Sequence, residues 1–289
     1  MALEPPQRLV RALGENDEWL VHLHRTVQEA VDRRRLDVER VVVPGGRSGL
    51  VLLVRRSDGT PAALKLAPPT AAPALERAAL AHWNGWGAVR LLDEEGDGLL
   101  MERLQPDVSL RSLPEAKALL EAAGTVRRLW VEPPAGHGFE TVAARTERQA
   151  EAMRARGAGE PLVAAALAAR EELVASAPEL LLLHGNFRQG KVLAGERVPW
   201  LAVGPEPVVG ERAYDLARLV RDRVEDLVAA AAGASSARRR VNRLADSLEV
   251  DRDRLRGWTL FRAVESGVRA VASGRRAEGE LALEFAGWL

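Results

Sequence analysis

The chain has 289 residues, of which 47% are apolar and 28% charged, and its 41 basic residues balance its 41 acidic ones. This balance argues against a nucleic-acid-binding protein, because such proteins usually carry a clear basic excess. The absence of cysteine excludes disulfides, thiolate metal sites and thiol nucleophiles.

The start of the chain lacks the basic and then apolar order of a signal peptide, and no apolar run reaches the length of a membrane span. We therefore expect a soluble, cytoplasmic protein with neither nucleic acid nor membrane as a partner.

The sequence pattern of residues 1–104 predicts a small antiparallel sheet with accompanying helices. Apolar residues recur at helical spacing over residues 16–36, and a second helix is expected over 72–86, after two prolines. Runs rich in β-branched and other apolar residues, separated by glycine-containing turns, predict strands in the same part of the chain. The expected strands cover residues 41–43, 50–54, 62–66, 88–92 and 98–104.

Residues 105–289 predict a mainly helical region with one β-rich interruption. The interruption consists of a polar loop at 185–191 with short apolar runs on both sides. Strands are expected there over residues 180–184, 192–193 and 199–203. Helices are expected over residues 114–130, 141–156 and 161–177, and again from 213 to the C-terminus.

The glycine-rich segment Pro-Gly-Gly-Arg-Ser-Gly at residues 44–49 lies between two expected strands. Glycines such as Gly45 and Gly46 allow backbone N–H groups to approach a phosphate without interference from a Cβ atom. A hairpin turn without any ligand explains the same residues equally well.

Lys65 lies in an expected strand among apolar neighbours, where an ammonium group requires an anion. Glu76 falls eleven residues later on the apolar stripe of the following helix, and the two charges are natural partners. The alternative is an edge-strand lysine that reaches water beside an unrelated glutamate on a helix face.

A distinctive motif begins at His184 and reads His-Gly-Asn-Phe-Arg-Gln-Gly-Lys-Val-Leu over residues 184–193. It is followed by Gly-Pro-Glu-Pro at 204–207 and Ala-Tyr-Asp-Leu-Ala at 213–217. Together these segments resemble the aminoglycoside phosphotransferase and hydroxyurea-resistance kinase family, of the streptomycin 6-kinase type, whose catalytic loop reads H-G-D-x-x-x-x-N-V-L. The resemblance extends over about residues 17–275.

The resemblance implies a two-lobed, protein-kinase-like α+β fold with an N-terminal lobe over residues 1–104, a helical lobe over 105–289 and nucleotide between them. It also implies that His184 and Asp215 brace the catalytic loop. The residues implied for nucleotide binding are Gly45, Gly46, Lys65, Glu76, the hinge residues Glu102 and Leu104, and Lys191.

Three positions depart from the family pattern. Asn186 stands where the resemblance implies the catalytic aspartate, and loss of a general base typically costs about 10²- to 10⁴-fold in rate. Lys191 and Gly204 stand where it implies the asparagine and the aspartate that hold magnesium. The substitutions therefore remove both protein ligands of the ion and add a cation.

We accordingly expect a degenerate member, a pseudokinase, that binds a nucleotide, a small molecule or a partner protein. Any ATP would bind without magnesium, through the charge of Lys191, unless that lysine only pairs with Glu206 or a nearby carboxylate. The alternative is an active ATP-dependent kinase of an aminoglycoside or sugar hydroxyl, in which Glu206 or Glu211 supplies the missing carboxylate. A third reading is an interaction module with a collapsed cleft.

The charges of the helix expected over residues 141–156 indicate what kind of small molecule could accept a phosphate. Aminoglycosides are polycations and require carboxylates around them. This segment carries Glu147 and Glu151 but also four arginines, Arg145, Arg148, Arg154 and Arg156. An anionic acceptor pocket is therefore not evident, which argues against streptomycin as the ligand.

Overall fold

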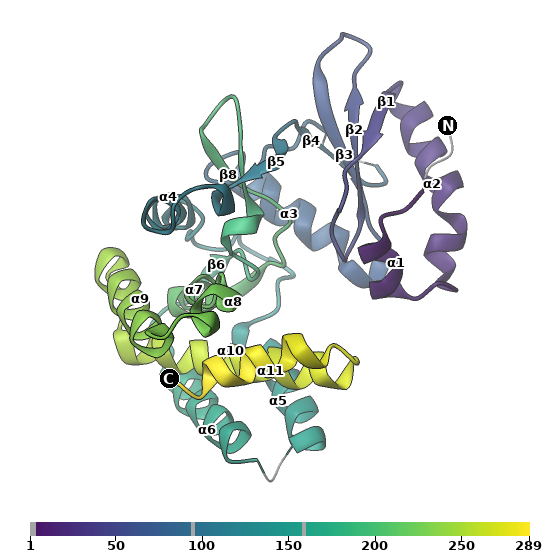
Figure 1. Cartoon of the computed structure of the whole chain (residues 1–289). Helices are drawn as coiled ribbons and strands as arrows, with labels where there is room; N and C mark the ends of the chain where they lie inside the picture. The colour runs from purple at the N-terminus through teal and green to yellow at the C-terminus, as the bar shows by residue number, and fades with distance from the viewer. Residues whose placement is uncertain (1–3, 94–95, 158–159) are drawn as a thin grey trace. The chain divides into compact units, whose positions relative to one another are not determined.

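A computed structural model describes residues 4–93, 96–157 and 160–289 (Figure 1). The chain forms two compact units. The first unit comprises Met1–Ser112 and Leu193–Val203, and the second unit comprises Leu113–Val192 and Gly204–Leu289. The first unit thus continues past residue 104 and includes a hairpin from the middle of the chain.

The first unit is built around a four-stranded antiparallel sheet in the order β1-β2-β3-β4. Its strands are β1 (Asp37–Val41), β2 (Leu50–Arg55), β3 (Pro61–Leu66) and β4 (Leu99–Glu102), and its helices are α1 (Gln7–Leu13), α2 (Glu18–Arg34) and α3 (Pro73–Trp83). Asp17 caps the N-terminus of α2, because its carboxylate accepts the N–H groups of Trp19 and Leu20.

The core of this unit lies between the sheet and the N-terminal helices. Leu9 from α1 and Leu23 and Val27 from α2 pack in one buried cluster with the apolar residues of β2 and β3. The periodicity of residues 16–36 predicted α2, whereas α1 is too short to produce a helical repeat that the sequence alone reveals.

The strand expected over residues 41–43 lies earlier, at Asp37–Val41, and the first unit differs from expectation in two further details. Residues 88–92 form no strand of the sheet but only single bridges, from Ala88 to Ala202 and from Leu91 to Met101. Strand β5 (Gln105–Ser109) was not expected; it pairs with β7 (Val192–Ala194), which in turn pairs with β8 (Trp200–Ala202).

The second unit is mainly helical and contains one two-stranded ladder, β6 (Leu181–Leu183) with β9 (Val208–Gly210). Its helices are α4 (Glu115–Arg127), α5 (Val142–Gly157), α6 (Pro161–Ala175), α7 (Arg212–Val220), α8 (Val224–Ala229), α9 (Gly233–Leu248), α10 (Arg252–Ala272) and α11 (Arg276–Ala286).

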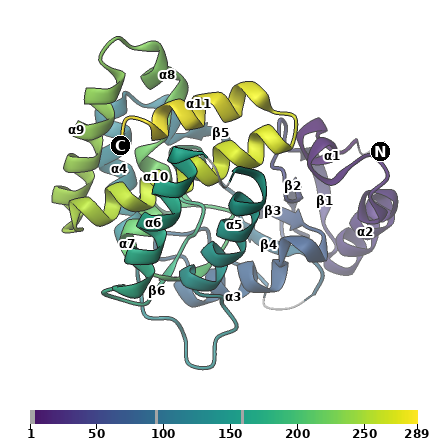
Figure 2. The same cartoon turned by 90° about the horizontal axis from the view of Figure 1, so that it is seen from below.

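Helix α10 is the central element of the second unit and packs against α6, α7 and α11. Figure 2 shows it running beside α6 and α11. Its buried face carries Trp258 and Phe261, whose rings meet edge to face, and Trp258 meets Tyr214 of α7 in the same way. This packing fixes α7, the helix that follows the catalytic-loop motif.

None of the helices in the described part of the chain combines the length and the apolar character needed to cross a membrane.

Candidate functional site

Lys65 lies on β3, which is an interior strand paired with β2 on one side and β4 on the other. Its Nζ atom is 2.5 Å from Oε2 of Glu76 on α3, and both side chains are buried. The alternative of an edge-strand lysine reaching water is therefore wrong. Among the described residues, Oε1 of Glu76 is buried without a hydrogen-bond partner. The pair thus retains an unused polar atom.

The glycine-rich segment forms the turn between β1 and β2, and two of its glycines are required by the fold. Gly45 has a φ of 66°, and a Cβ atom there would lie 2.8 Å from Pro6. A Cβ on Gly49 would lie 2.6 Å from the carbonyl oxygen of Leu66. Gly46 has no such constraint. Its role, like that of Gly45 toward phosphate, stays a prediction.

The side chain of Glu102, at the end of β4, is occupied within the first unit. Its carboxylate accepts two hydrogen bonds from Arg197, at 3.0 and 2.6 Å, and one from the N–H of Arg90 at 2.8 Å. Leu104 is buried. A nucleotide contact at these hinge positions would therefore use backbone groups rather than the Glu102 carboxylate.

The catalytic-loop motif follows β6 and is anchored to α7 through Asp215. The buried Asp215 carboxylate accepts the N–H groups of His184 at 3.0 Å and Gly185 at 2.9 Å. Burial raises the pKa of Asp215, against the opposing effects of Arg262 and of these two N–H groups. The ring of His184 is fully buried, and its Nδ1 accepts the N–H of Asn186 at 3.2 Å. Both residues therefore have the contacts that a loop brace needs.

Asn186 and Glu206 form a polar pair at the position implied for the catalytic base. Nδ2 of Asn186 donates to Oε1 of Glu206 at 2.6 Å. Asn186 itself is buried, and its Oδ1 has no hydrogen-bond partner among the described residues. The exposed Glu206 is thus the carboxylate that the structure brings to the base position.

Lys191 and Gly204, thirteen residues apart, meet in space. Gly204 has a φ of 60°, and a Cβ atom built on it would lie 2.5 Å from the Nζ atom of Lys191. Lys191 ends a short 3-10 turn, Gln189–Lys191, and its side chain is half-buried. The ammonium group therefore occupies the space into which a side chain at position 204 would extend.

Arg145 holds the segment that carries Glu206 and is a site residue that the sequence did not reveal. Its guanidinium donates to the carbonyl oxygens of Glu206 and Pro207, both at 2.9 Å, and to Glu140 at 2.5 Å. These contacts join positions far apart in the sequence. No local pattern distinguishes Arg145 from the other arginines of α5.

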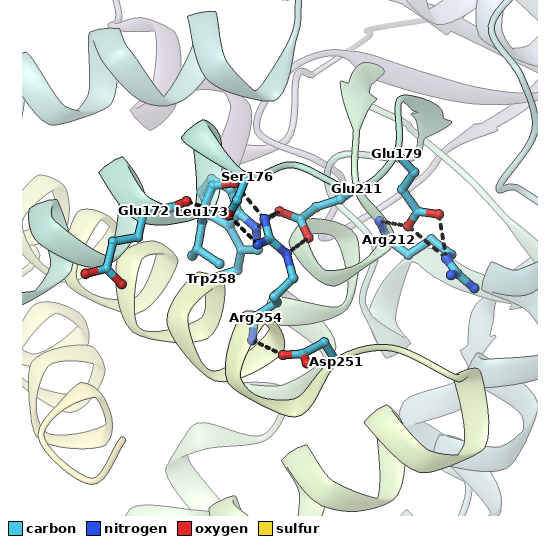
Figure 3. Close-up of polar contacts among 9 residues, drawn as sticks. All are labelled: Glu172, Leu173, Ser176, Glu179, Glu211, Arg212, Asp251, Arg254 and Trp258. Carbon is cyan, nitrogen blue, oxygen red and sulfur yellow. Dashed lines mark hydrogen bonds and ion pairs between the residues drawn. The ribbon is translucent and has the colours of Figure 1, made fainter.

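Glu211 was expected as a possible metal-binding carboxylate, and this expectation is wrong. Figure 3 shows its two oxygens facing Arg254 and Trp258. Arg254 donates to both oxygens at 2.6 Å, and Nε1 of Trp258 donates to Oε1 at 2.6 Å. Glu211 is buried and fully used in joining α10 to the start of α7. Within the described ranges, no three His, Asp or Glu side chains gather in a metal-binding group.

Comparisons with known proteins agree with this arrangement. Residues 34–274 match the family model of the aminoglycoside/hydroxyurea antibiotic resistance kinases. The chain belongs to this family. It is 35% identical to a streptomycin 6-kinase of Streptomyces glaucescens, over 96% of this chain and 92% of that one. It is also 37% identical to a hydroxyurea phosphotransferase of Kitasatospora aureofaciens, over 89% of this chain and 76% of that one.

Solved structures of kinases share the fold of this chain. The aminoglycoside phosphotransferase APH(4)-Ia matches with a TM-score of 0.63 at 15% identity, over 91% of this chain and 97% of that chain. A choline kinase from Cryptosporidium parvum matches with a TM-score of 0.58 at 10% identity, over 91% of this chain and 93% of that chain. The expected protein-kinase-like α+β fold is therefore confirmed.

Proposed function

We propose that this member of the resistance-kinase family is a pseudokinase that binds nucleotide without magnesium and lacks magnesium-dependent phosphotransfer. The observation that carries the proposal is the position of Lys191. Its ammonium lies where a side chain at position 204 would extend. The cation of the lysine thus replaces the cation that the family resemblance implies.

The residues present do not fit magnesium. Gly204 offers no side-chain oxygen, and Lys191 offers a positive charge in place of an amide oxygen. Two unit charges about 4 Å apart repel by about 4 kcal/mol at an effective dielectric constant of 20, and a divalent ion roughly doubles this value.

Two features support retained nucleotide binding. Lys65 and Glu76 remain paired in a buried position, although such a pair contributes little to stability compared with apolar residues of the same volume. Lys191 supplies a fixed charge that can neutralise phosphate oxygens without an ion. A bound nucleotide would explain why the buried Lys65–Glu76 pair is retained and what the charge of Lys191 neutralises.

The proposal is tested by titrating ATP into the protein by calorimetry, once with EDTA and once with excess magnesium. We expect binding in EDTA that magnesium does not strengthen, and loss of this binding in Lys65→Ala. Binding that requires magnesium would contradict the proposed role of Lys191. Absence of binding under both conditions would remove nucleotide from the proposal.

A combined variant tests whether the residues at positions 186, 191 and 204 are the reason that magnesium does not strengthen ATP binding. Asn186→Asp, Lys191→Asn and Gly204→Asp together should make ATP binding stronger with magnesium than with EDTA. Asn186→Asp alone is the control, because it leaves Lys191 and Gly204 unchanged and should show no magnesium dependence. If the folded triple variant binds ATP equally well with magnesium and with EDTA, these three residues do not explain the absence of a magnesium effect.

A slow kinase with a rearranged site is the second candidate function. The relatives named above are kinases, and Oε1 of Glu206 lies 2.6 Å from the amide of Asn186, beside the implied base position. Glu206 could then accept the proton that the missing aspartate would have accepted. Phosphate transfer to a panel of aminoglycosides and sugars, measured at high protein concentration, tests this candidate. Turnover that Glu206→Gln and Lys65→Ala both abolish would favour it over the pseudokinase.

A further inference from the structure

Arg103, the residue directly after β4, reaches across the sheet of the first unit. Its guanidinium donates to the carbonyl oxygen of Ala62 on β3 at 3.1 Å and to that of Val54 on β2. It also donates to Oε2 of Glu39 on β1 at 2.6 Å. One side chain, attached at the end of β4, therefore contacts each of the three other strands.

These contacts fix the guanidinium in place. The ion pair with Glu39 is partly exposed, and Glu39 also pairs with Arg55 at 2.8 Å, so this pair alone contributes little. The two carbonyl oxygens, however, belong to paired strands inside the sheet, and hydrogen bonds from a charged donor are stronger than neutral ones. Arg103 thus ties the chain after β4 to a rigid support.

The residue before it is held from another direction. The carboxylate of Glu102 accepts two hydrogen bonds from Arg197 and one from the N–H of Arg90. Two successive side chains are therefore bound to different parts of the first unit. Together they restrict the backbone at the position from which Leu104 continues.

Leu104 follows these two anchored residues and has unused backbone groups. It lies between β4 and β5 and is buried. Within the residues that the structure describes, neither its N–H group nor its carbonyl oxygen forms a hydrogen bond. Buried backbone polar groups are almost always paired, so an unpaired donor and acceptor on one residue indicate a place for a ligand.

A cavity of about 290 Å³ lies at this place, and its lining comes from the first unit. Arg103 and Leu104 are among the lining residues, together with the apolar Leu53, Val108 and Ala194. Small-molecule sites typically combine apolar walls with a few polar groups that set the orientation of the ligand. A flat ring with a donor and an acceptor on one edge, such as the base of a nucleotide, has the matching chemistry.

We propose that Arg103 is a positioning residue, which holds the N–H and carbonyl groups of Leu104 where they bind the base of a nucleotide. Arg103 acts through the backbone of Leu104, so it contributes to recognition of the base and not of the phosphates. The inference rests on the proposed nucleotide binding, which depends on Lys191 and the phosphates instead. The two can be tested apart, because base and phosphates can be supplied as separate molecules.

The probes are adenosine, inorganic triphosphate and ATP, each titrated by calorimetry in EDTA. Arg103→Gln should weaken binding of adenosine and of ATP by about tenfold, the loss expected for charged hydrogen bonds, and leave triphosphate binding unchanged. Lys191→Gln should weaken ATP and triphosphate and leave adenosine unchanged. A merely structural role of Arg103 would change all three affinities together or none of them.

Three further variants complete the test. Arg103→Lys keeps the charge but cannot donate to both carbonyl oxygens, so it should restore part of the adenosine binding. Glu39→Gln removes the ion pair alone and should weaken adenosine by about two- to fivefold, and it replaces Arg103→Gln if that variant does not fold. Arg33→Gln is the matched control, because Arg33 pairs with Asp97 at 2.9 Å on the surface of the same unit. It should bind adenosine like the unmodified chain.

The outcomes separate the two proposals. Equal affinity of folded Arg103→Gln and the unmodified chain for adenosine would overturn the role of Arg103, and ATP binding in EDTA would still support the proposed function. Binding of adenosine without binding of triphosphate, and with no gain for ATP, would overturn the role of Lys191 and leave that of Arg103 standing. Absence of binding of both adenosine and ATP would overturn both.

Discussion

Gly185 is the residue of the catalytic loop that tolerates a side chain least. Its φ is 73°, and a Cβ atom there would lie 1.9 Å from the carbonyl oxygen of Glu206. That carbonyl is itself held by Arg145. The close approach of two backbone segments therefore accounts for this glycine without reference to any ligand.

We expect Gly185→Ala to lower the free energy of unfolding by about 2 kcal/mol or more, because it combines backbone strain with a steric clash. Urea unfolding followed by circular dichroism measures the change. Gly124→Ala is the matched control. Gly124 lies within α4 with no atom within 4 Å of its would-be Cβ, and replacing a helical glycine with alanine should stabilise by about 0.5–1 kcal/mol. Equal effects of the two variants would contradict the steric argument.

At the residue scale the sequence revealed which positions depart from the family pattern, but not which contacts the residues at those positions make. Asn186, Lys191 and Gly204 could be singled out because each stands in a recognisable motif. The contact between Lys191 and the space at Gly204, and the hydrogen bond from Asn186 to Glu206, depend on the path of the chain between them. Such contacts have no local signature, so the sequence could not predict them.

The link between α5 and the segment 204–207 is an element-scale feature with a measurable pH dependence. Burial raises the pKa of Glu140, but hydrogen bonds from Arg145 and Arg148 outweigh this effect and hold the pKa below its usual value of 4.5. Since the unfolded chain takes up this proton at a higher pH than the folded chain, the ion pairs stabilise the fold above about pH 4.5. Their contribution is lost as the pH falls through the lowered pKa of the folded state.

Glu140→Gln should therefore lower the free energy of unfolding at pH 7 by about 1 kcal/mol, the effect of a partly exposed, charged hydrogen bond. The difference from the unmodified chain should shrink as the pH falls below 4.5, which urea unfolding at several pH values measures. Glu151→Gln, which replaces an exposed carboxylate of α5, is the control and should have little effect at any pH. A difference that does not vary with pH would argue against the ion-pair explanation.

Elements were predictable where their residues repeat over several turns. The helices α2, α4, α5 and α6 show such repeats, and the structure places them close to the expected ranges. The strands β5 and β9 were missed, because β5 contains a proline and an aspartate and β9 directly follows the residues Gly-Pro-Glu-Pro at 204–207, which are typical of a turn. The apolar run at residues 88–92 suggested a strand, but it makes only single bridges, from Ala88 to β8 and from Leu91 to β4, and of its residues only Ala88 and Val89 are buried.

The whole molecule is not divisible at a single point of the chain. Residues 193–203 belong to the first unit, although residues on both sides of them belong to the second. Within the first unit this hairpin pairs with β5 through β7, and Ala202 exchanges backbone hydrogen bonds of 2.9 Å with Gly87 and Val89. The contiguous segment 1–112 is consequently an incomplete unit.

We expect a fragment of residues 1–112 to unfold at lower temperature and less cooperatively than the first unit does in the whole chain. The matched fragment carries residues 193–203 after residue 112, joined by a flexible glycine-serine linker, and should recover a cooperative transition. Circular dichroism during heating measures both. A cooperative transition of residues 1–112 alone, at the same temperature as the linked fragment, would show that the hairpin is dispensable.

Function was less accessible from sequence than fold, and composition explains part of this. The chain carries 41 basic residues spread over its whole length, so no single arginine attracts notice. Arg218 and Arg262 lie on different helices, and Arg188 lies in a loop. The packing of α10 on α7 brings Arg262 to the catalytic loop, where it donates to the carbonyl oxygens of Gly185 and Tyr214.

On the proposed function, the contact between Lys191 and Gly204 also determines which changes could build an ion site at this position. A first change of Gly204 to aspartate would create a carboxylate that the neighbouring lysine neutralises. A first change of Lys191 to asparagine would supply one oxygen ligand with no second one opposite it. Neither single change builds a site for the ion, so a chain that holds magnesium at this position requires both substitutions together.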